Sequence, residues 1–171
     1  ETPHITHLLD ARDGNMERIY QELKDILPAQ QVGSQKFIVS WSRLPNFKGR
    51  DESLIELHQK LIGDGRVGIK TAGLHGTGGI GKTQLAVEYA HRYRYYYPAG
   101  VYWLNGGADW QSEVADCAVH IDRSLLSESL EGRVLAFRDY LAKQSQDALI
   151  VLDNCENPGD VLKYEIAPKL K

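Results

Sequence analysis

The stretch that decides the fold reads Gly76-Thr77-Gly78-Gly79-Ile80-Gly81-Lys82-Thr83. Four of its eight residues are glycines, which adopt at low cost the backbone torsions that turn successive N–H groups toward one point. Converging donors of this kind, followed by a lysine and a hydroxyl residue, match the Walker A pattern in full. The sequence therefore predicts a phosphate-binding loop.

The residues on either side predict the context that this loop requires. Residues 67–74 alternate in polarity and predict a strand before it. Residues 82–93 repeat apolar side chains at helical spacing and predict a helix after it, whose positive N-terminal end favours phosphate. Lys82 is then expected to reach the β- and γ-phosphates, and the Thr83 hydroxyl to bind Mg²⁺. Gln84 follows directly and is assigned to the same nucleotide-binding group.

A second part of the site is predicted further along the chain. Residues 148–152 form a continuous apolar run that ends at Asp153, which is typical of a buried parallel strand. An aspartate at the carboxyl end of such a strand lies at the crevice where α/β sheets bind ligands, and there it can orient water or a metal beside Thr83. The next residue is Asn154, at the position where a fast ATPase usually places a carboxylate. We therefore assign Lys82, Asp153 and Asn154 to catalysis and expect slow hydrolysis, with Glu156, two residues further on, as the alternative base.

The remaining periodicities complete an α/β plan. They predict strands at 37–39 and 100–104. They also predict helices at 16–27, 51–63, 114–121 and 130–141. Strands that alternate with helices predict the three-layer sandwich of P-loop NTPases, built on a mostly parallel sheet and preceded by a helical N-terminal segment.

Composition excludes several classes of function. The chain has 171 residues and a net charge of −3, so no basic field predicts nucleic acid or an anionic membrane as partner. A basic and aromatic run at 92–97 could stack on single-stranded nucleic acid, but it precedes a predicted buried strand. No run approaches the length of a membrane helix. Two cysteines cannot form a disulfide framework, which favours a reducing, cytoplasmic location.

Four ordered motifs resemble the STAND class of P-loop NTPases, which includes the NB-ARC domains of plant resistance proteins. The segment Phe47-Lys48-Gly49-Arg50-Asp51, with its following helix, resembles the F-x-G-R-x-x-E-L motif, although Ser53 replaces the glutamate. Residues 77–86 are similar to the phosphate loop of that class, 97–105 to its second strand, and 149–158 to a Walker B segment of bacterial members. The resemblance covers residues 45–171.

This resemblance implies a molecular switch, in which ADP holds a closed monomer and ATP permits homo-oligomerisation. It implies that Lys48 and Arg50 contact the nucleoside end of ATP or ADP. It divides the chain into a helical segment and linker (1–44) and an NB-ARC-like nucleotide-binding domain (45–171). Later motifs of the class are absent, so we expect the chain to be part of a longer protein whose C-terminal domains are its partners.

The resemblance also implies a sheet order. The strands at 100–104, 148–152 and 67–74 should lie side by side in that order, which leaves the strand at 67–74 at an edge of this chain's sheet. Such an edge invites pairing, and residues 37–39 are a local candidate to cover it.

Three other functions remain open at this point. A metabolic P-loop phosphotransferase would use the same phosphate loop, but no segment for binding an acceptor is visible. A GTPase would require a guanine-binding Asn-Lys-x-Asp motif, which is absent from these residues. A scaffold with a structural nucleotide would need no catalytic group.

Overall fold

The computed structural model describes residues 35–62, 69–70, 81–106 and 109–154. The chain divides into two compact units, Glu1–Gln35 and Lys36–Lys171, and every element described below belongs to the second. Four predictions fall wholly or partly outside the described residues: the helix at 16–27, the strand at 67–74 apart from Ile69 and Lys70, the phosphate loop from Gly76 to Ile80, and the part of the Walker B segment that follows Asn154.

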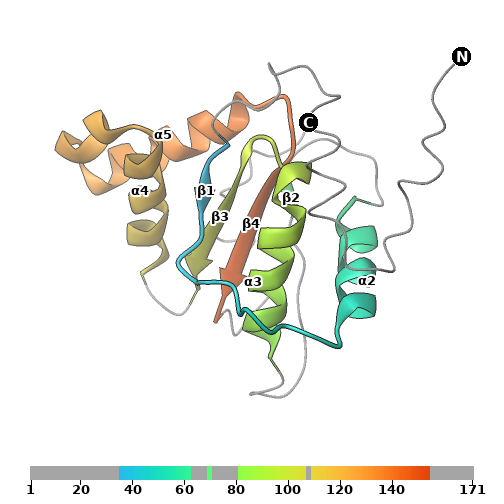
Figure 1. Cartoon of the computed structure of the whole chain (residues 1–171). Helices are drawn as coiled ribbons and strands as arrows, with labels where there is room; N and C mark the ends of the chain where they lie inside the picture. The colour runs from blue at the N-terminus through green and yellow to red at the C-terminus, as the bar shows by residue number, and fades with distance from the viewer. Residues whose placement is uncertain (1–34, 63–68, 71–80, 107–108, 155–171) are drawn as a thin grey trace, which may run out of the picture. The chain divides into compact units, whose positions relative to one another are not determined.

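The described strands form one parallel sheet. They are β1 (Phe37–Ile38), β2 (Ile69–Lys70), β3 (Gly100–Asn105) and β4 (Ala148–Asp153), and their order across the sheet is β1-β3-β4-β2 (Figure 1). β4 pairs with β3 on one side and with β2 on the other. The predicted order of the strands at 100–104, 148–152 and 67–74 is therefore confirmed.

The predicted position of β1 is wrong. We expected residues 37–39 to cover the edge at β2, but β1 pairs with β3 at the opposite edge, with Phe37 beside Val101. A strand of two residues carries too little alternation to specify its partner. Long-range contacts place it instead: the N–H of Val101 donates to the carbonyl of Lys36 at 2.9 Å, and the ring of Phe37 lies edge-on to His91 at 4.9 Å.

The helices agree with the periodicities in the sequence. The described α-helices are α2 (Asp51–Ile62), α3 (Lys82–Tyr93), α4 (Trp110–Ile121) and α5 (Leu130–Ala142). Two short 3-10 helices follow α3 and α4, namely η4 (Arg94–Tyr96) and η5 (Arg123–Ser127). Side chains cap two of them, because Asp109 accepts from the N–H of Gln111 before α4 and Ser129 from the N–H of Gly132 before α5. None of the described helices is long and apolar enough to cross a membrane.

Helices cover both faces of the sheet (Figure 1). On one face Tyr102 and Leu104 of β3 pack in a cluster with residues of α4 and α5. On the other, Val101 of β3 and Leu149 of β4 pack in a cluster with residues of α2 and α3. Successive strand residues point to opposite faces, so β3 is buried from Gly100 to Leu104. The α/β class with a parallel sheet between helices is confirmed.

β3 begins with a glycine that no other residue can replace without a shift. Gly100 has a φ of 119°, and a Cβ there would collide with the hydroxyl and ring of Tyr102. That ring folds back over the start of its own strand, and its hydroxyl donates to the carbonyl of Ala99 at 2.8 Å.

The path of the chain locates a crevice. From β2 it passes through α3, on one face, to β3, which lies on the far side of β4. From β3 it returns through α4 and α5, on the other face, to β4. Where connections leave opposite faces of a parallel sheet, the ligand site lies beyond the carboxyl ends of the strands. Asn105 and Asp153 occupy those ends.

Candidate functional site

The central contact of the site joins the two predicted halves. The Thr83 hydroxyl, in the first turn of α3, donates to Oδ1 of Asp153 at 3.0 Å. These residues are 70 positions apart in the chain, and both side chains are half-buried. The structure thus brings together the hydroxyl and the carboxylate that the sequence assigned to the metal.

The start of α3 has the geometry expected at the end of a phosphate loop. Gly81 precedes the helix with φ 79° and ψ 29°, in the left-handed region, and a Cβ on it would meet no atom within 4 Å. Gly81, the N-cap residue, has no side chain to cap the helix, which suits a helix N-terminus that binds an anion. Lys82 follows Gly81 and is half-buried.

Gln84 is a further polar group at this helix end. Its side-chain Oε1 is buried and has no hydrogen-bond partner among the described residues. A buried polar atom without a partner is costly, and the oxygen and nitrogen of a glutamine amide are assigned and not observed. The assignment of Gln84 to the nucleotide-binding group stays a prediction.

The residue that follows Asp153 donates a second hydrogen bond to the same carboxylate oxygen. Asn154 has a φ of 56°, which places it in the left-handed region, where asparagine is tolerated better than most residues. Its N–H donates to Oδ1 of Asp153 at 3.1 Å, and its Nδ2 donates to Oδ1 of Asn105 at 3.3 Å. The side chain of Asn154 is therefore directed along the strand ends toward β3.

Two residues at this edge were not assigned from the sequence. Asn105, the last residue of β3, is the register partner of Asp153, and its N–H donates to a carboxylate oxygen of Glu113 at 3.2 Å. Glu113 lies in the first turn of α4. Asn105 could have been found by its position in the sequence. It is a polar residue that ends an apolar strand, and such a residue lies at the same edge of a parallel sheet as Asp153.

The donor set fits a magnesium ion accompanied by phosphates. Mg²⁺ prefers oxygen ligands and is often bound through one or two protein groups plus substrate phosphates and water. Thr83 and Asp153 offer such oxygens at one point. No group of three or more His, Cys, Asp or Glu side chains that could hold a metal occurs among the described residues, so an ion here would depend on its ligand's own oxygens.

The residues assigned to the nucleoside end precede α2. Lys48 is exposed, Arg50 is half-buried, and the carbonyl of Arg50 accepts from the N–H of Leu54 at the start of α2. Phe47 packs against the cluster between the sheet and the two helices α2 and α3. The role of Lys48 and Arg50 toward a nucleoside stays a prediction.

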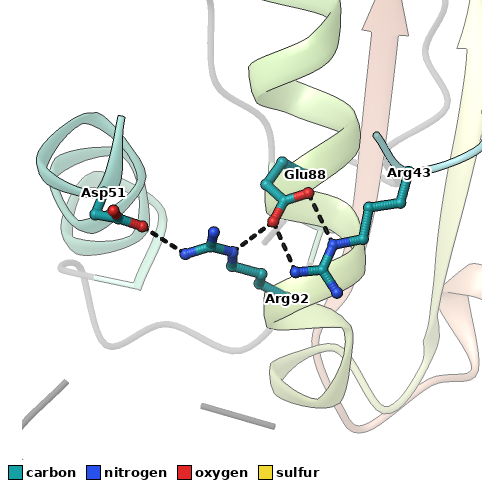
Figure 2. A network of polar contacts seen from close by, with 4 residues as sticks. All are labelled: Arg43, Asp51, Glu88 and Arg92. Carbon is teal, nitrogen blue, oxygen red and sulfur yellow. Dashed lines mark hydrogen bonds and ion pairs between the residues drawn. The ribbon is translucent and has the colours of Figure 1, made fainter. Parts of the chain in front are cut away.

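A network of charged side chains on α3 was also missed (Figure 2). Its centre is Glu88, a buried carboxylate that contacts the guanidinium groups of Arg43 and Arg92. In the sequence Glu88 reads as an ordinary helix residue. Nothing local distinguishes it, because its partner Arg43 is 45 positions away.

The basic and aromatic run at 92–97 is partly buried in the core. Tyr93 and Tyr97 are buried, and Arg92 is engaged in ion pairs. Cys117 is likewise buried in the apolar cluster under α4 and α5, and burial raises the pKa of its thiol to about 12.

Comparison with known proteins gives one distant similarity. The chain is 29% identical over 127 residues to a regulatory protein, AfsR of Streptomyces griseus. The aligned region covers 69% of this chain and 13% of that protein, so the chain spans only a small part of the relative. No family model matches the chain. No solved structure matches it either.

Proposed function

We propose that this chain binds ATP or ADP with Mg²⁺ and serves as a regulatory nucleotide switch. The observation that carries the proposal is the hydrogen bond between Thr83 and Asp153. A hydroxyl that follows the Walker A lysine and an acid that ends a buried parallel strand meet at one point. This pairing is the arrangement that holds magnesium in P-loop NTPases.

Each residue then has a defined task. The loop from Gly76 to Gly81 would donate backbone N–H groups to phosphate oxygens, and Lys82 would add a positive charge at the β- and γ-phosphates. Magnesium supplies charge neutralisation on the phosphates when it is bound. Thr83 would turn its oxygen toward the metal, and Asp153 would hold the metal or its water.

Slow hydrolysis follows from the groups near Asp153. The Thr83 hydroxyl donates to Asp153, and the side-chain amide of Asn154, the next residue, donates to Asn105; neither the hydroxyl nor the amide accepts a proton at neutral pH. An amide orients water without deprotonating it. A long-lived ATP state suits a switch, because the state must outlast the assembly that it permits.

The regulatory role rests on the similarity to a regulatory protein and on the motifs of the STAND class. In this proposal ADP maintains a closed monomer, and ATP permits homo-oligomerisation together with further domains of a longer chain. Lys48 and Arg50 supply the nucleoside contacts.

The first experiment compares Lys82→Ala with a matched control, Lys143→Ala, which removes an exposed lysine at the end of α5. A charge-assisted phosphate contact contributes about 1.5–3 kcal/mol, so Lys82→Ala should weaken binding of MgATP about tenfold or more. The control should bind as the wild type does. Equal affinity of all three proteins in calorimetric titration would remove the assignment.

A second pair of variants isolates the metal. Thr83→Ser keeps the hydroxyl and should keep the dependence of ATP affinity on magnesium, whereas Thr83→Val removes the hydroxyl and should abolish that dependence. The nucleotide that co-purifies with the protein separates the remaining alternatives: ADP favours the switch, GDP a GTPase, and none a metabolic phosphotransferase.

A further inference from the structure

A clamp of four alternating charges ties the chain before α2 to the phosphate-loop helix. We use the term clamp for Arg43, Asp51, Glu88 and Arg92 (Figure 2). Arg43 donates to both carboxylate oxygens of Glu88, at 2.9 and 2.8 Å. Arg92 donates to Glu88 at 2.5 Å and to Asp51 at 2.6 Å. Two positive and two negative groups thus form one continuous line.

The carboxylate at the centre is withdrawn from water. The side chain of Glu88 is 2% exposed, against 45% for Arg43 and 21% for Arg92. Burial alone raises the pKa of this carboxyl, but the hydrogen bonds and charges of the two guanidinium groups outweigh burial and lower the pKa overall. Glu88 is therefore ionised at neutral pH and depends on both arginines.

The clamp fixes the two ends of one loop. Residues 44–50 lie between Arg43 and Asp51, and both of these anchor on the same face of α3. The middle of the loop is held as well, because Phe47 packs in the cluster with α2 and α3 and its ring lies 6.0 Å from the guanidinium of Arg92. The loop carries Lys48, which is exposed and offers its charge to a ligand.

The anchor point is close to the proposed phosphate site without belonging to it. Glu88 is five positions beyond Thr83 on the same helix, a rise of about 7 Å along its axis. A helix of this length moves as one body. The clamp therefore holds loop 44–50 at a fixed position relative to the end of α3 that carries Lys82 and Thr83.

Stability alone does not account for such a network. Ion pairs with a buried member contribute little compared with apolar side chains of the same size, and their clearest use is to fix one geometry among several. Bidentate pairing of Arg43 with Glu88 fixes direction as well as distance. A loop that must meet a ligand held by another element requires this kind of constraint.

We propose that the clamp positions loop 44–50 on α3 and thereby sets the affinity for the nucleoside end of the nucleotide. The inference rests on the proposed function, because it assumes that the phosphates lie at the start of α3 and that Lys48 and Arg50 contact the nucleoside. Arg43 and Glu88 are positioning residues, which act through the loop.

The test separates the two ends of the ligand. Inorganic tripolyphosphate probes the phosphate loop alone, and ADP probes both ends, each with magnesium. In the full chain, Arg43→Met should lower the affinity for ADP about fivefold. The affinity for tripolyphosphate should stay within about twofold of the wild-type value. Hydrogen exchange at 44–50 should become faster. Arg43→Lys keeps the charge but loses the bidentate contact, and should recover part of the ADP affinity.

Lys60→Met is the matched control, since Lys60 is an exposed cation that pairs with Glu56 on α2 and does not contact α3 in the described network. It should change neither affinity. Glu88→Gln should reproduce the selective loss of ADP affinity and exceed that of Arg43→Met, because it removes the charge that both guanidinium groups share and leaves Arg92 paired with Asp51 alone.

Two results would overturn the inference alone: equal losses for ADP and tripolyphosphate in Arg43→Met, or ADP affinity unchanged in both Arg43→Met and Glu88→Gln. A wild-type chain that binds neither ligand would overturn the proposed function, and the inference with it.

Discussion

The two faces of the sheet are built from different interactions. Under α4 and α5 the cluster is almost entirely apolar, and Phe137 meets the ring of Tyr102 edge-on at 5.1 Å. Under α2 and α3 a chain of polar contacts runs through the interior, from His58 to the hydroxyl of Tyr89 at 2.9 Å and on to that of Tyr97 at 2.5 Å. The clamp at Glu88 belongs to this same side.

The two faces differ in how strictly their contacts fix the orientation of the side chains. Apolar packing contributes stability but tolerates small shifts, whereas hydrogen bonds and ion pairs hold donors and acceptors within narrow limits. The face with directional contacts is the face that carries the phosphate-loop helix. We infer that α4 and α5 mainly stabilise the fold, and that α2 and α3 mainly fix the geometry of the site.

Truncation on the apolar face should have the largest effect on stability. Phe137 is fully buried, so Phe137→Ala should lower the free energy of unfolding by about 3–5 kcal/mol. Leu135→Ala, on the exposed side of the same helix, should change it by less than about 0.5 kcal/mol. Urea denaturation measures both. Similar losses in the two variants would contradict the assigned core, and the folded fraction of Phe137→Ala should keep wild-type ADP affinity.

Removal of one hydroxyl from the polar face should have an intermediate effect. Burial raises the pKa of Tyr97 to about 12, so its hydroxyl stays protonated and needs a partner. Tyr89→Phe removes the hydrogen bonds that Tyr89 forms with this hydroxyl and with the ring nitrogen of His58, and should lower the free energy of unfolding by about 1–3 kcal/mol. Tyr96→Phe, at an exposed position, is the control. Equal melting temperatures for wild type and Tyr89→Phe would show that the chain of hydroxyls contributes nothing.

Acid should weaken the polar face selectively. Burial lowers the pKa of His58 to about 4, from an ordinary value near 6.5. Between these pH values the unfolded chain binds more protons than the folded one, so stability falls as the pH falls from 6.5 toward 4, by about 1 kcal/mol per pH unit. His58→Gln should remove this dependence in unfolding measured at pH 6.5 and pH 5. Below that range protonation of Glu88 adds its own loss, because its pKa is also lowered. An unchanged slope in the variant would assign the effect to other groups.

Loss of an exposed ion pair should have the smallest effect. Lys60 and Glu56 lie 2.7 Å apart on α2, and both side chains are about two-thirds exposed. Such pairs are screened by water and salt. Lys60→Met should leave the melting temperature unchanged within error at low and at high salt. A measurable loss would mean that polar contacts on α2 contribute to stability even at the surface.

The sequence predicted what is local. The helix at Lys82–Tyr93 and the strand ending at Asp153 follow from periodicity and from one motif each. The meeting of Thr83 with Asp153 followed because parallel strands and phosphate-loop helices share one edge. Long-range choices without a repeating pattern were not predictable: the edge taken by β1, the pairing of Arg43 with Glu88, and the carboxylate of Glu113 at the end of β3.

The start of strand β3 restricts which residues can replace one another during evolution. Gly100 lacks a side chain where the hydroxyl of Tyr102 folds back, and that hydroxyl is held by the carbonyl of Ala99. A larger residue at 100 would meet the tyrosine and would also be strained by the φ of 119°, so loss of the tyrosine removes one of two reasons for the glycine. Positions 100 and 102 should therefore covary among homologues, as a linked pair inside an apolar strand whose other members exchange independently. In a deep alignment, glycine at 100 should accompany tyrosine at 102 more often than the separate frequencies of the two residues predict.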